Sequence, residues 1–475
     1  MIRSNKIALS VDWGIILIYL FLVAVGWVNI FSVGYSEEQK TFFDFSQRYG
    51  KQLVWIVMGL LVGAAVLYTD SKFFVSFAYL IYAFFILMLV LVLLVGNEVN
   101  GAKSWLTLGG VGFQPSEFAK LGTALALSRL VSSYNFSIKN NVTRLKILAL
   151  ILLPVALILL QHDTGSALVY LVFLIPLFRE GLSGLILFFC VLFVVLFILS
   201  LKISPLVLLV VLIALASLVY YFLKKNGTNI AKGMLLLLVN AVWITGLVWL
   251  IKGHFPGFYY VLFRASLLSG LIVLGFAYYK KRMRQVLVSG VFVLSILFSF
   301  SVDFAFERVL EPHHQDRINH LLGIESDPLG AGYNVNQSKI AIGSGGFVGK
   351  GFLKGTQTKF DFVPEQSTDF IFCTIGEEWG FVGSAVVLFL FIFLIVRMIL
   401  ISEKQRSVFS RFYGYCVASI FFFHFAINIG MTIGLAPVIG IPLPFLSYGG
   451  SSLWFFTLLL FVLLRLDANR MEQLH

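Results

Sequence analysis

The stretch MIRSNKIALSVDWGIILIYLFLVAVGWVNIF, from Met1 to Phe31, begins with basic residues and continues into a long apolar run. The run is longer than the hydrophobic region of a signal peptide, and no small-residue cleavage site follows it. A retained first membrane helix is therefore predicted. Runs of the same kind recur along the chain, and they decide the fold class.

Composition leads to the same prediction. The chain has 475 residues, of which 59% are hydrophobic and 12% are charged, and its mean hydropathy is +0.94. A soluble domain is about half apolar and about a quarter charged, so this chain has too few charges to coat a globule of its size. Repeated apolar runs of roughly 18 residues indicate transmembrane helices. We expect an all-α, polytopic transmembrane bundle.

The apolar runs predict about 14 helices in a single membrane domain over residues 1–475. They fall at residues 13–34, 51–68, 74–95, 113–132, 147–160, 164–179, 183–201, 204–223, 233–252, 258–279, 285–302, 370–398, 409–434 and 447–466. The run at 147–160 is short, so flanking residues are expected to extend it.

The net charge of +12 does not indicate nucleic-acid binding, because the Lys and Arg residues are scattered in short loops. With Arg3 and Lys6 in the cytoplasm, alternation places the other short basic loops and the C-terminus there too, as the positive-inside rule requires. A polar segment of about 67 residues, 303–369, then faces the other side. Long loops in compact proteins are usually functional or disordered, and an ordered functional loop is favoured here.

Charged residues at membrane depth are costly and usually mark function. Glu117 and Lys120 follow Pro115 at a predicted helix start, and their spacing of three puts them on one helix face. They form either a structural ion pair or the wall of a polar cavity. Lys103 and Trp105 lie just before, at interface depth, where an indole is most often a membrane anchor.

Two further places combine carboxylates with apolar runs. Asp163 lies in a very short loop, where it either caps the following helix or faces a cavity. Asp369 ends the long loop, and Glu377 and Glu378 lie inside the next helix. At least one of these adjacent glutamates must face a polar cavity or a cationic partner.

The long loop contains SDPLGAGYNVNQSKIAIGSGG, from Ser326 to Gly346. Asp327 precedes a proline, which disfavours helix at that position, and the glycines that follow permit a tight turn or close approach to a ligand. A loop carboxylate is also often merely solvated. The glycine spacing matches neither a phosphate-binding loop nor a dinucleotide fingerprint. The adjacent His313 and His314 lack the spacing of a metal site, and none is predicted.

Six motifs occur in order along the chain. They are GAKSWLTLGG (101–110), FQPSEFAKL (113–121), HDTGSALV (162–169), RINHLLGIESDPLGAGYNVNQSKIAIGSGGFVGKGFLKGTQT (317–358), FVPEQSTDFIFCTIGEEWGFVG (362–383) and GIPLPFLSYGGSS (440–452). Together they closely resemble the SEDS family of bacterial membrane glycosyltransferases, and the 326–358 region looks like its RodA branch. The resemblance covers nearly the whole chain except roughly 183–280.

The resemblance implies a peptidoglycan glycosyltransferase that polymerises lipid II on the outer face of the bacterial cytoplasmic membrane. It implies a role in cell elongation and rod shape, with a class B penicillin-binding protein as transpeptidase and elongation-complex proteins as further partners. The family's essential aspartate matches Asp327. A carboxylate there would take the proton of the acceptor GlcNAc 4-hydroxyl, which then attacks the donor MurNAc C1 with inversion.

The resemblance also implies the other site residues. Candidates for pairing with the pyrophosphate are Lys103, Lys120, Arg317 and Lys339; a divalent cation, Mg²⁺ or Mn²⁺, is an alternative, and no other cofactor is implied. Glu117 and Lys120 match the family's cavity-lining pair. Further residues at family motif positions are Trp105, Asp163, Gln337, Ser338, Asp369, Glu378 and Ser447.

Two departures from the family stand out. Residues 183–280 look like an insertion of about four helices relative to the usual ten, and Ser104 stands where many relatives have Arg before the Trp. Three other interpretations stay open: a lipid II flippase or transporter, a division- or sporulation-type polymerase, and a scaffold for the penicillin-binding protein. Transporters often show inverted repeats with paired broken helices, and no such pairing is visible here.

Overall fold

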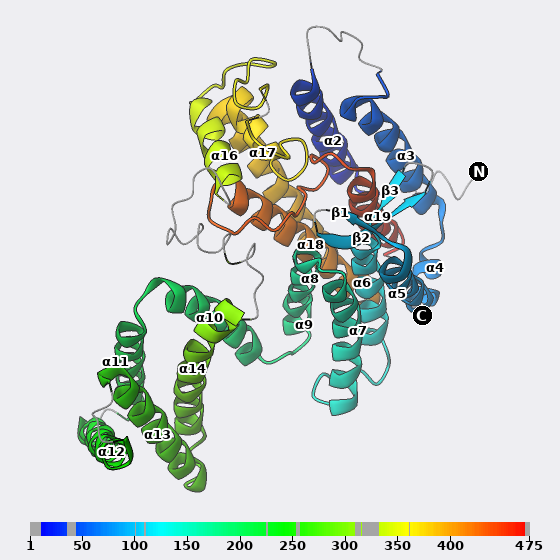
Figure 1. The fold of residues 1–475 in the computed structure, drawn as a ribbon. Helices are drawn as coiled ribbons and strands as arrows, with labels where there is room; N and C mark the ends of the chain where they lie inside the picture. The colour runs from blue at the N-terminus through cyan, green and yellow to red at the C-terminus, as the bar shows by residue number, and fades with distance from the viewer. Residues whose placement is uncertain are drawn as a thin grey trace. The chain divides into compact units, whose positions relative to one another are not determined.

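A computed structural model describes residues 11–35, 44–99, 101–108, 111–224, 227–252, 257–308, 315, 332–360 and 362–470. The chain divides into two compact units (Figure 1). Unit 1 combines Met1–Ser183 with Pro328–His475, and unit 2 is Gly184–Asp327. Both consist of helices, which confirms the predicted all-α membrane bundle.

Unit 1 contains most of the helices and a small sheet. Its helices are α2 (Trp13–Gly34), α3 (Arg48–Tyr68), α4 (Ser71–Ser76), α5 (Ala78–Val95), α6 (Pro115–Val131), α7 (Asn141–Leu160), α8 (Thr164–Val169), η1 (Tyr170–Phe173), α9 (Leu174–Arg179), α16 (Tyr333–Ser344), α17 (Ile371–Glu403), α18 (Val408–Thr432) and α19 (Gly450–Ala468). Its strands are β1 (Asn97–Val99), β2 (Ala102–Leu108) and β3 (Val111–Phe113), paired antiparallel in that order. Strands this short carry too little alternation to be recognised in sequence.

In the described residues, twelve helices are long and apolar enough to cross a membrane. The other two predicted runs correspond to α6, which has 17 residues, and to the consecutive short helices α8, η1 and α9. The short run at 147–160 is extended upstream to Asn141, as expected. The prediction of about 14 helices is thus confirmed.

The core of unit 1 lies around α6, α18 and α19. Every residue of α6 except Arg129 is buried, and the apolar windows of α18 and α19 are 61% and 78% buried. The equivalent windows of α3, α5 and α7 are only 22–28% buried. Burial in a membrane bundle comes from neighbouring helices, so the heavily buried helices are central and the others present apolar faces to lipid.

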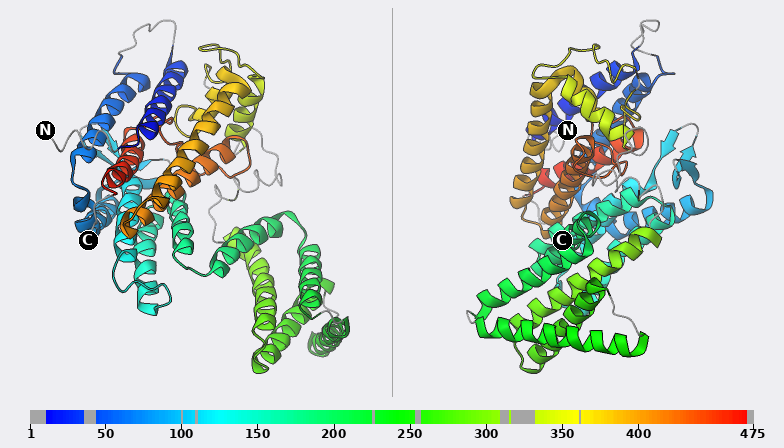
Figure 2. Two further views of the ribbon diagram at one scale, coloured as in Figure 1. Left: turned by 180° about the vertical axis from the view of Figure 1, so that it is seen from behind. Right: turned by 60° about the vertical axis from the view of Figure 1, so that its left-hand side comes forward.

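Unit 2 consists of five long helices that pack on one another (Figures 1 and 2). They are α10 (Gly184–Lys202), α11 (Pro205–Lys224), α12 (Gly227–Lys252), α13 (Phe258–Tyr279) and α14 (Met283–Arg308). Ring pairs join them, with centroids 4.6 Å apart for Phe193 and Phe298 and also for Phe263 and Phe300. The predicted insertion at 183–280 stays a prediction, and the unit that the contacts define continues to Asp327.

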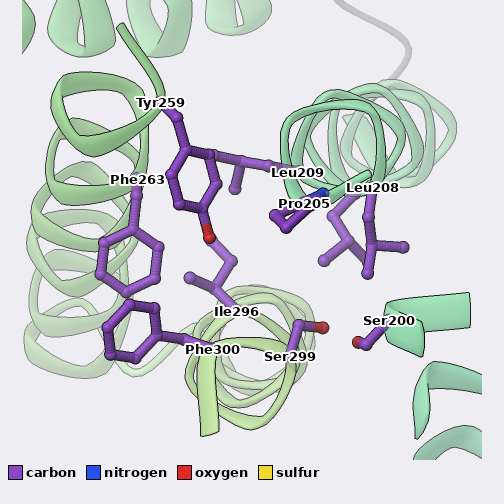
Figure 3. Close-up of a pocket in the computed structure, with 10 residues that line it drawn as sticks. Ser200, Pro205, Leu208, Leu209, Tyr259, Phe263, Ile296, Ser299 and Phe300 are labelled. Carbon is purple, nitrogen blue, oxygen red and sulfur yellow. The ribbon is translucent and has the colours of Figure 1, made fainter. Parts of the chain in front are cut away.

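One hollow in unit 2 lies between the end of α10 and helices α11, α13 and α14 (Figure 3). Its volume is about 20 Å³, which holds about one water molecule. The hydroxyls of Ser200 and Ser299 line it and have no hydrogen-bond partner among the described residues. The hollow therefore suits a bridging water and is too small for a sugar or a lipid.

Candidate functional site

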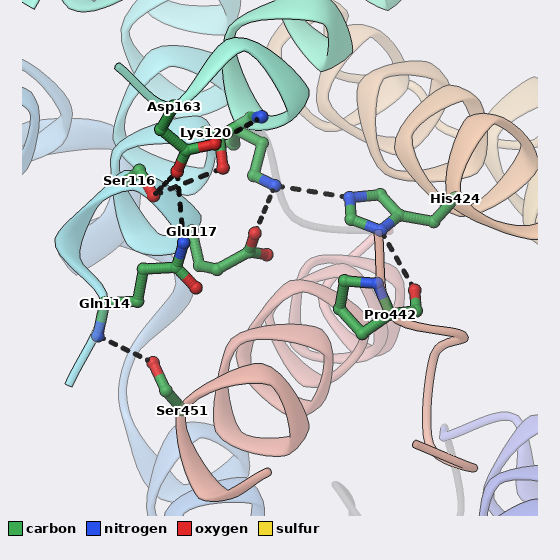
Figure 4. A network of polar contacts seen from close by, with 9 residues as sticks. Gln114, Ser116, Glu117, Lys120, Asp163, His424, Pro442 and Ser451 are labelled. Carbon is green, nitrogen blue, oxygen red and sulfur yellow. Dashed lines mark hydrogen bonds and ion pairs between the residues drawn. The ribbon is translucent and has the colours of Figure 1, made fainter. Parts of the chain in front are cut away.

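A buried polar network centres on Lys120 of α6 (Figure 4). Its ammonium lies 2.9 Å from Glu117 Oε1, and the two side chains are 0% and 4% exposed. The same ammonium lies 3.2 Å from Nε2 of His424 on α18 and 5.0 Å from the centroid of the Phe455 ring on α19. The pair predicted from the spacing of Glu117 and Lys120 is thus formed, and it joins three central helices.

His424 completes the network, and the sequence analysis missed it. Its Nδ1 lies 3.2 Å from the carbonyl oxygen of Pro442. Because a carbonyl only accepts, Nδ1 carries the hydrogen and Nε2 is left to accept from the Lys120 ammonium. A single imidazole within the apolar run FFFHFAI was a signal that could have found it, since ionisable residues inside membrane helices are rare.

The contacts bear on the two alternatives for Glu117 and Lys120. Lys120 is engaged on three sides within the protein, which is the geometry of a structural ion pair. Glu117 Oε2, in contrast, is buried and has no hydrogen-bond partner among the described residues. Buried acceptors normally have a donor or an ordered water, so this oxygen is the part of the pair open to a further ligand.

Asp163 lies at the start of α8, next to the start of α6 (Figure 4). Its Oδ1 accepts from the backbone N–H of Ser166 at 2.9 Å, which is the predicted helix cap. Its Oδ2 accepts from Gln114 Nε2 at 3.1 Å and from Ser116 Oγ at 3.4 Å. The Gln114 backbone N–H donates in turn to Ser451 Oγ at 3.1 Å, so the first turns of α6, α8 and α19 are tied together.

The segment before α19 is fixed by α18. Asn428, one turn after His424, donates through Nδ2 to the carbonyl of Ile441 at 2.7 Å and to that of Asp369 at 2.8 Å. Ser447 Oγ donates to the carbonyl of Thr368 at 2.6 Å. The structure thus brings the predicted residues Asp369 and Ser447 together, and their backbones are held in place by hydrogen bonds.

Glu377 organises the loop between α16 and α17. Its Oε1 accepts from Lys350 Nζ at 2.6 Å and from the backbone N–H groups of Thr356 and Gln357 at 2.8 and 2.9 Å. Its Oε2 accepts from the backbone N–H and the hydroxyl of Thr358 at 2.9 and 2.8 Å. This buried carboxylate has both the cationic partner expected of one of the two glutamates and a full set of donors.

Glu378 is less completely paired than its neighbour. It accepts a hydrogen bond from Ser32 of α2, and its Oε2 is buried without a hydrogen-bond partner among the described residues. The sequence analysis had selected Glu378 and not Glu377 as a site residue. Like Glu117, Glu378 leaves one buried acceptor open.

Helix α17 is broken at Gly380, whose φ and ψ are 63° and −156°. The break frees backbone groups, and the segment after α16 satisfies them. Lys350 and Gly351 donate to the carbonyls of Glu377 and Glu378 at 3.0 and 2.9 Å, and the N–H of Phe381 donates to the carbonyl of Gly346 at 2.9 Å. Non-helical backbone at membrane depth persists where protein satisfies it in this way.

The glycines of this segment permit that close backbone contact. A Cβ at Gly345 would lie 2.0 Å from the Gly376 carbonyl oxygen, and one at Gly349 would lie 2.2 Å from that of Glu378. No real side chain tolerates such contacts. These two glycines are therefore explained by packing against α17. The possible approach to a ligand was predicted for Gly330 and Gly332, and Gly330 lies outside the described residues.

The other predicted site residues that the structure describes range from buried to exposed. Lys103 donates to the carbonyls of Leu93 and Leu94 at 2.9 and 3.3 Å, so it neutralises the C-terminal end of α5. Ser338 is buried and donates to the carbonyl of Thr432 at 2.9 Å. Lys339 is exposed and lies against Gly434. Trp105 and Gln337 are half-buried.

Asp327 and Arg317 lie outside the described residues, as do His313 and His314. Within the described part of the chain, no group of three His, Cys, Asp or Glu side chains is placed to hold a metal ion. Of the predicted site residues that the structure describes, most are held by hydrogen bonds within the protein, and Lys339 is exposed.

The protein has several helices long and apolar enough to cross a membrane. Between them lie buried polar groups that pair with one another, and an ordered loop packs against α17. These features define a polytopic integral membrane protein. More particularly, the chain belongs to the FtsW/RodA/SpoVE family of cell cycle proteins, whose sequence model matches residues 12–237 and 204–472. The predicted SEDS membership is thus confirmed.

Individual relatives agree with this assignment. The chain is 36% identical over 464 residues to peptidoglycan glycosyltransferase RodA of Treponema pallidum (strain Nichols), covering 97% of this chain and 98% of that one. It is 31% identical over 400 residues to peptidoglycan glycosyltransferase MrdB of Escherichia coli (strain K12), covering 84% and 80%. These relatives confirm the predicted RodA branch and the enzyme class.

A solved structure is also similar. It is described as the structural coordination of polymerization and crosslinking by a peptidoglycan synthase complex, and the matched chain is 25% identical with a TM-score of 0.61. The match covers 98% of this chain and 100% of that one. The helical arrangement described above is therefore that of a known membrane fold.

Proposed function

We propose that this peptidoglycan glycosyltransferase polymerises lipid II into glycan strands at the outer face of the bacterial cytoplasmic membrane, for cell elongation. The observation that carries the proposal is the 36% identity to a relative named RodA over nearly the full length of both chains. Lipid II is the undecaprenyl-pyrophosphate-linked disaccharide pentapeptide. Its sugar lies at the membrane surface, on the side to which the positive-inside rule assigns residues 303–369.

Asp327 is the general base of the proposed reaction. Its carboxylate takes the proton of the acceptor GlcNAc 4-hydroxyl, and the oxygen attacks C1 of the donor MurNAc. The bond from C1 to the pyrophosphate oxygen breaks as the new glycosidic bond forms, so an α-linkage becomes a β-linkage. Undecaprenyl pyrophosphate carries away the electron pair, and one base with leaving-group stabilisation suffices for such an inversion.

Among the described lysines predicted to pair with the leaving pyrophosphate, Lys339 is the one that is exposed. It lies on α16, whereas Lys103 donates to the end of α5 and Lys120 is buried against Glu117 and His424. Arg317 or a divalent cation would add further positive charge.

The proposed partner is a class B penicillin-binding protein that crosslinks the new strands. Its support is the likeness to a chain from a complex in which polymerization and crosslinking are coordinated. Both termini are proposed to be cytoplasmic, since this places the short basic loops on the cytoplasmic side.

The test uses the purified full-length chain with its transpeptidase partner and labelled lipid II. Wild type should produce glycan strands, and Asp327→Asn should produce none above background. Lys339→Gln should raise the KM for lipid II at least severalfold, whereas Lys354→Gln, a change at an exposed lysine in the loop after α16, should not. Polymerisation by Asp327→Asn would refute the base assignment. Transbilayer movement of lipid II without polymer would refute the polymerase.

A further inference from the structure

Unit 2 contains a large cavity that the proposed reaction does not use. Its volume is about 530 Å³, which falls within the roughly 300–1,000 Å³ typical of ligand sites. Helices α11, α12, α13 and α14 all contribute to its wall. A space of this size between membrane helices is filled by some molecule, and its lining shows which kind.

The inner wall is suited to hydrocarbon. It consists of apolar side chains and small residues, the latter being Ala216, Ser217, Gly233, Ser266, Ser269, Gly270 and Ser289. Ser266 and Ser289 donate to the carbonyls of Leu262 and Gln285 in their own helices, at 2.6 and 2.7 Å. Ser269 accepts from Asn240 at 2.8 Å. Hydroxyl groups bonded in this way present little polarity to a ligand.

One end of the cavity is basic. Lys232, Lys280 and Arg282 line it, together with Gln285. A second hollow of about 280 Å³ shares Arg282 and Gln285 with the first and adds Arg284. Lys280, Arg282 and Arg284 lie where α13 ends and α14 begins, and Lys232 lies near the start of α12. The apolar space therefore has a cationic mouth.

Across the described helices α10 to α13 and the first 20 residues of α14, the sequence of unit 2 carries no carboxylate beside this mouth. Between Glu180 and Asp303 the chain contains ten Lys and Arg residues and no Asp or Glu. Asp303 follows Gln285 by 303 − 285 = 18 residues on α14, which at 1.5 Å per residue is about 27 Å along the helix. The positive charge at this mouth is therefore complementary to an anionic group.

We propose that unit 2 binds one anionic phospholipid, with its phosphate at Lys280 and Arg282 and an acyl chain in the cavity. Basic pockets between membrane helices bind anionic lipid headgroups in this manner. The sequence-based topology puts the mouth on the cytoplasmic side, where the positive-inside rule alone would also collect lysine and arginine. Basic residues that only set the orientation of the helices would not need a cavity beside them. Lys280 and Arg282 line one, and this favours a binding site.

Native mass spectrometry of the purified full-length chain with phosphatidylglycerol or phosphatidylcholine tests the proposal. Wild type should bind one phosphatidylglycerol at least tenfold more tightly than phosphatidylcholine. Lys280→Gln combined with Arg282→Gln should weaken phosphatidylglycerol binding by about tenfold or more, since each basic residue contributes substantially to anionic lipid affinity. Lys202→Gln is a control for the loss of a positive charge elsewhere in unit 2, because Lys202 ends α10 and lines neither hollow.

A second variant tests the cavity separately. A Cβ at Gly233 would meet nothing within 4 Å, so Gly233→Leu places a side chain in the cavity without a backbone clash and should weaken lipid binding severalfold. Gly246→Leu is the control, since it lies on the same helix in equally open space but outside the lining. Gel filtration and thermal unfolding confirm that each variant is folded.

Three outcomes would overturn the proposal. They are equal binding of the two lipids, equal weakening by Lys202→Gln, and unchanged binding in a folded Gly233→Leu variant. The first would mean that the headgroup is not selected, the second that the charge effect is nonspecific, and the third that the lipid sits elsewhere. None of them bears on polymerisation of lipid II, which is assayed separately.

Discussion

The ammonium of Lys120 lies 3.2 Å from Nε2 of His424, which joins α6 to α18 inside the membrane bundle. The same ammonium pairs with Glu117, and both charged side chains are almost completely buried. A buried charge is tolerated only while it is paired and hydrogen-bonded. Each partner therefore depends on the others, and the network should respond strongly to the loss of one member.

Replacement of Lys120 by Met should destabilise the protein by about 3–5 kcal/mol, because it leaves the Glu117 carboxylate buried and unpaired. Thermal unfolding of the purified protein measures the effect as a lower Tm. The double variant Glu117→Gln with Lys120→Met removes both charges and should recover part of the loss. A Lys120→Met protein that unfolds at the wild-type temperature would show that the pair does not stabilise the fold.

Glu377→Gln and Glu378→Gln should differ although the residues are adjacent. Glu377 accepts donors at both oxygens, so an amide group would leave at least one buried donor unpaired, at a cost of about 1–3 kcal/mol. Glu378 has one oxygen without a partner among the described residues and should tolerate the amide at a cost of about 1 kcal/mol or less.

Limited proteolysis at residues 350–358, together with Tm, distinguishes these two variants. Glu377→Gln should be cleaved several times faster than wild type, and Glu378→Gln at the wild-type rate. Similar protection of both would mean that Glu377 does not anchor the loop. Loss of polymerisation by a stable, protected Glu378→Gln would instead indicate a direct role for Glu378 in the reaction.

Gly380→Ala should be severely destabilising. Its backbone lies in a region that only glycine adopts readily, at a cost of about 1–3 kcal/mol for other residues. Its Cβ would also lie 2.3 Å from the backbone nitrogen of Gly349. Gly343→Ala is the control, because a Cβ there meets nothing and alanine favours helix. Yield and Tm measure the difference, and a wild-type Tm for Gly380→Ala would contradict the described break.

Asp163→Asn should leave stability nearly unchanged, whereas Asp163→Ala should lower it by about 1 kcal/mol. Asparagine caps a helix about as well as aspartate, and alanine cannot. The observed bond to the Ser166 N–H at 2.9 Å is such a cap. Tm and polymerisation should be measured together. If Asp163→Asn retains its Tm but loses polymerisation, Asp163 has a role that needs its charge.

Several features could be predicted because they depend on residues close together in sequence. The membrane helices follow from apolar runs, and the ion pair of Glu117 with Lys120 follows from their spacing on one helix. The cap at Asp163 was one of two open alternatives, since a residue next to a helix start can cap it whatever else it contacts. In the ion pair and in the cap, the two interacting residues are three positions apart.

By itself, the sequence determined that this chain is a membrane bundle, because the free energy of placing apolar runs in lipid is a local property of each run. The tertiary structure alone decided that His424 meets Lys120, that the Glu377 carboxylate receives hydrogen bonds from Lys350, Thr356, Gln357 and Thr358, and that Lys103 caps α5. A helix that is apolar on all sides carries no signal for the face that it buries. The polar partners are therefore chosen by packing, and the segments that meet lie 10 residues apart for Lys103 and Leu93 but 304 apart for Lys120 and His424.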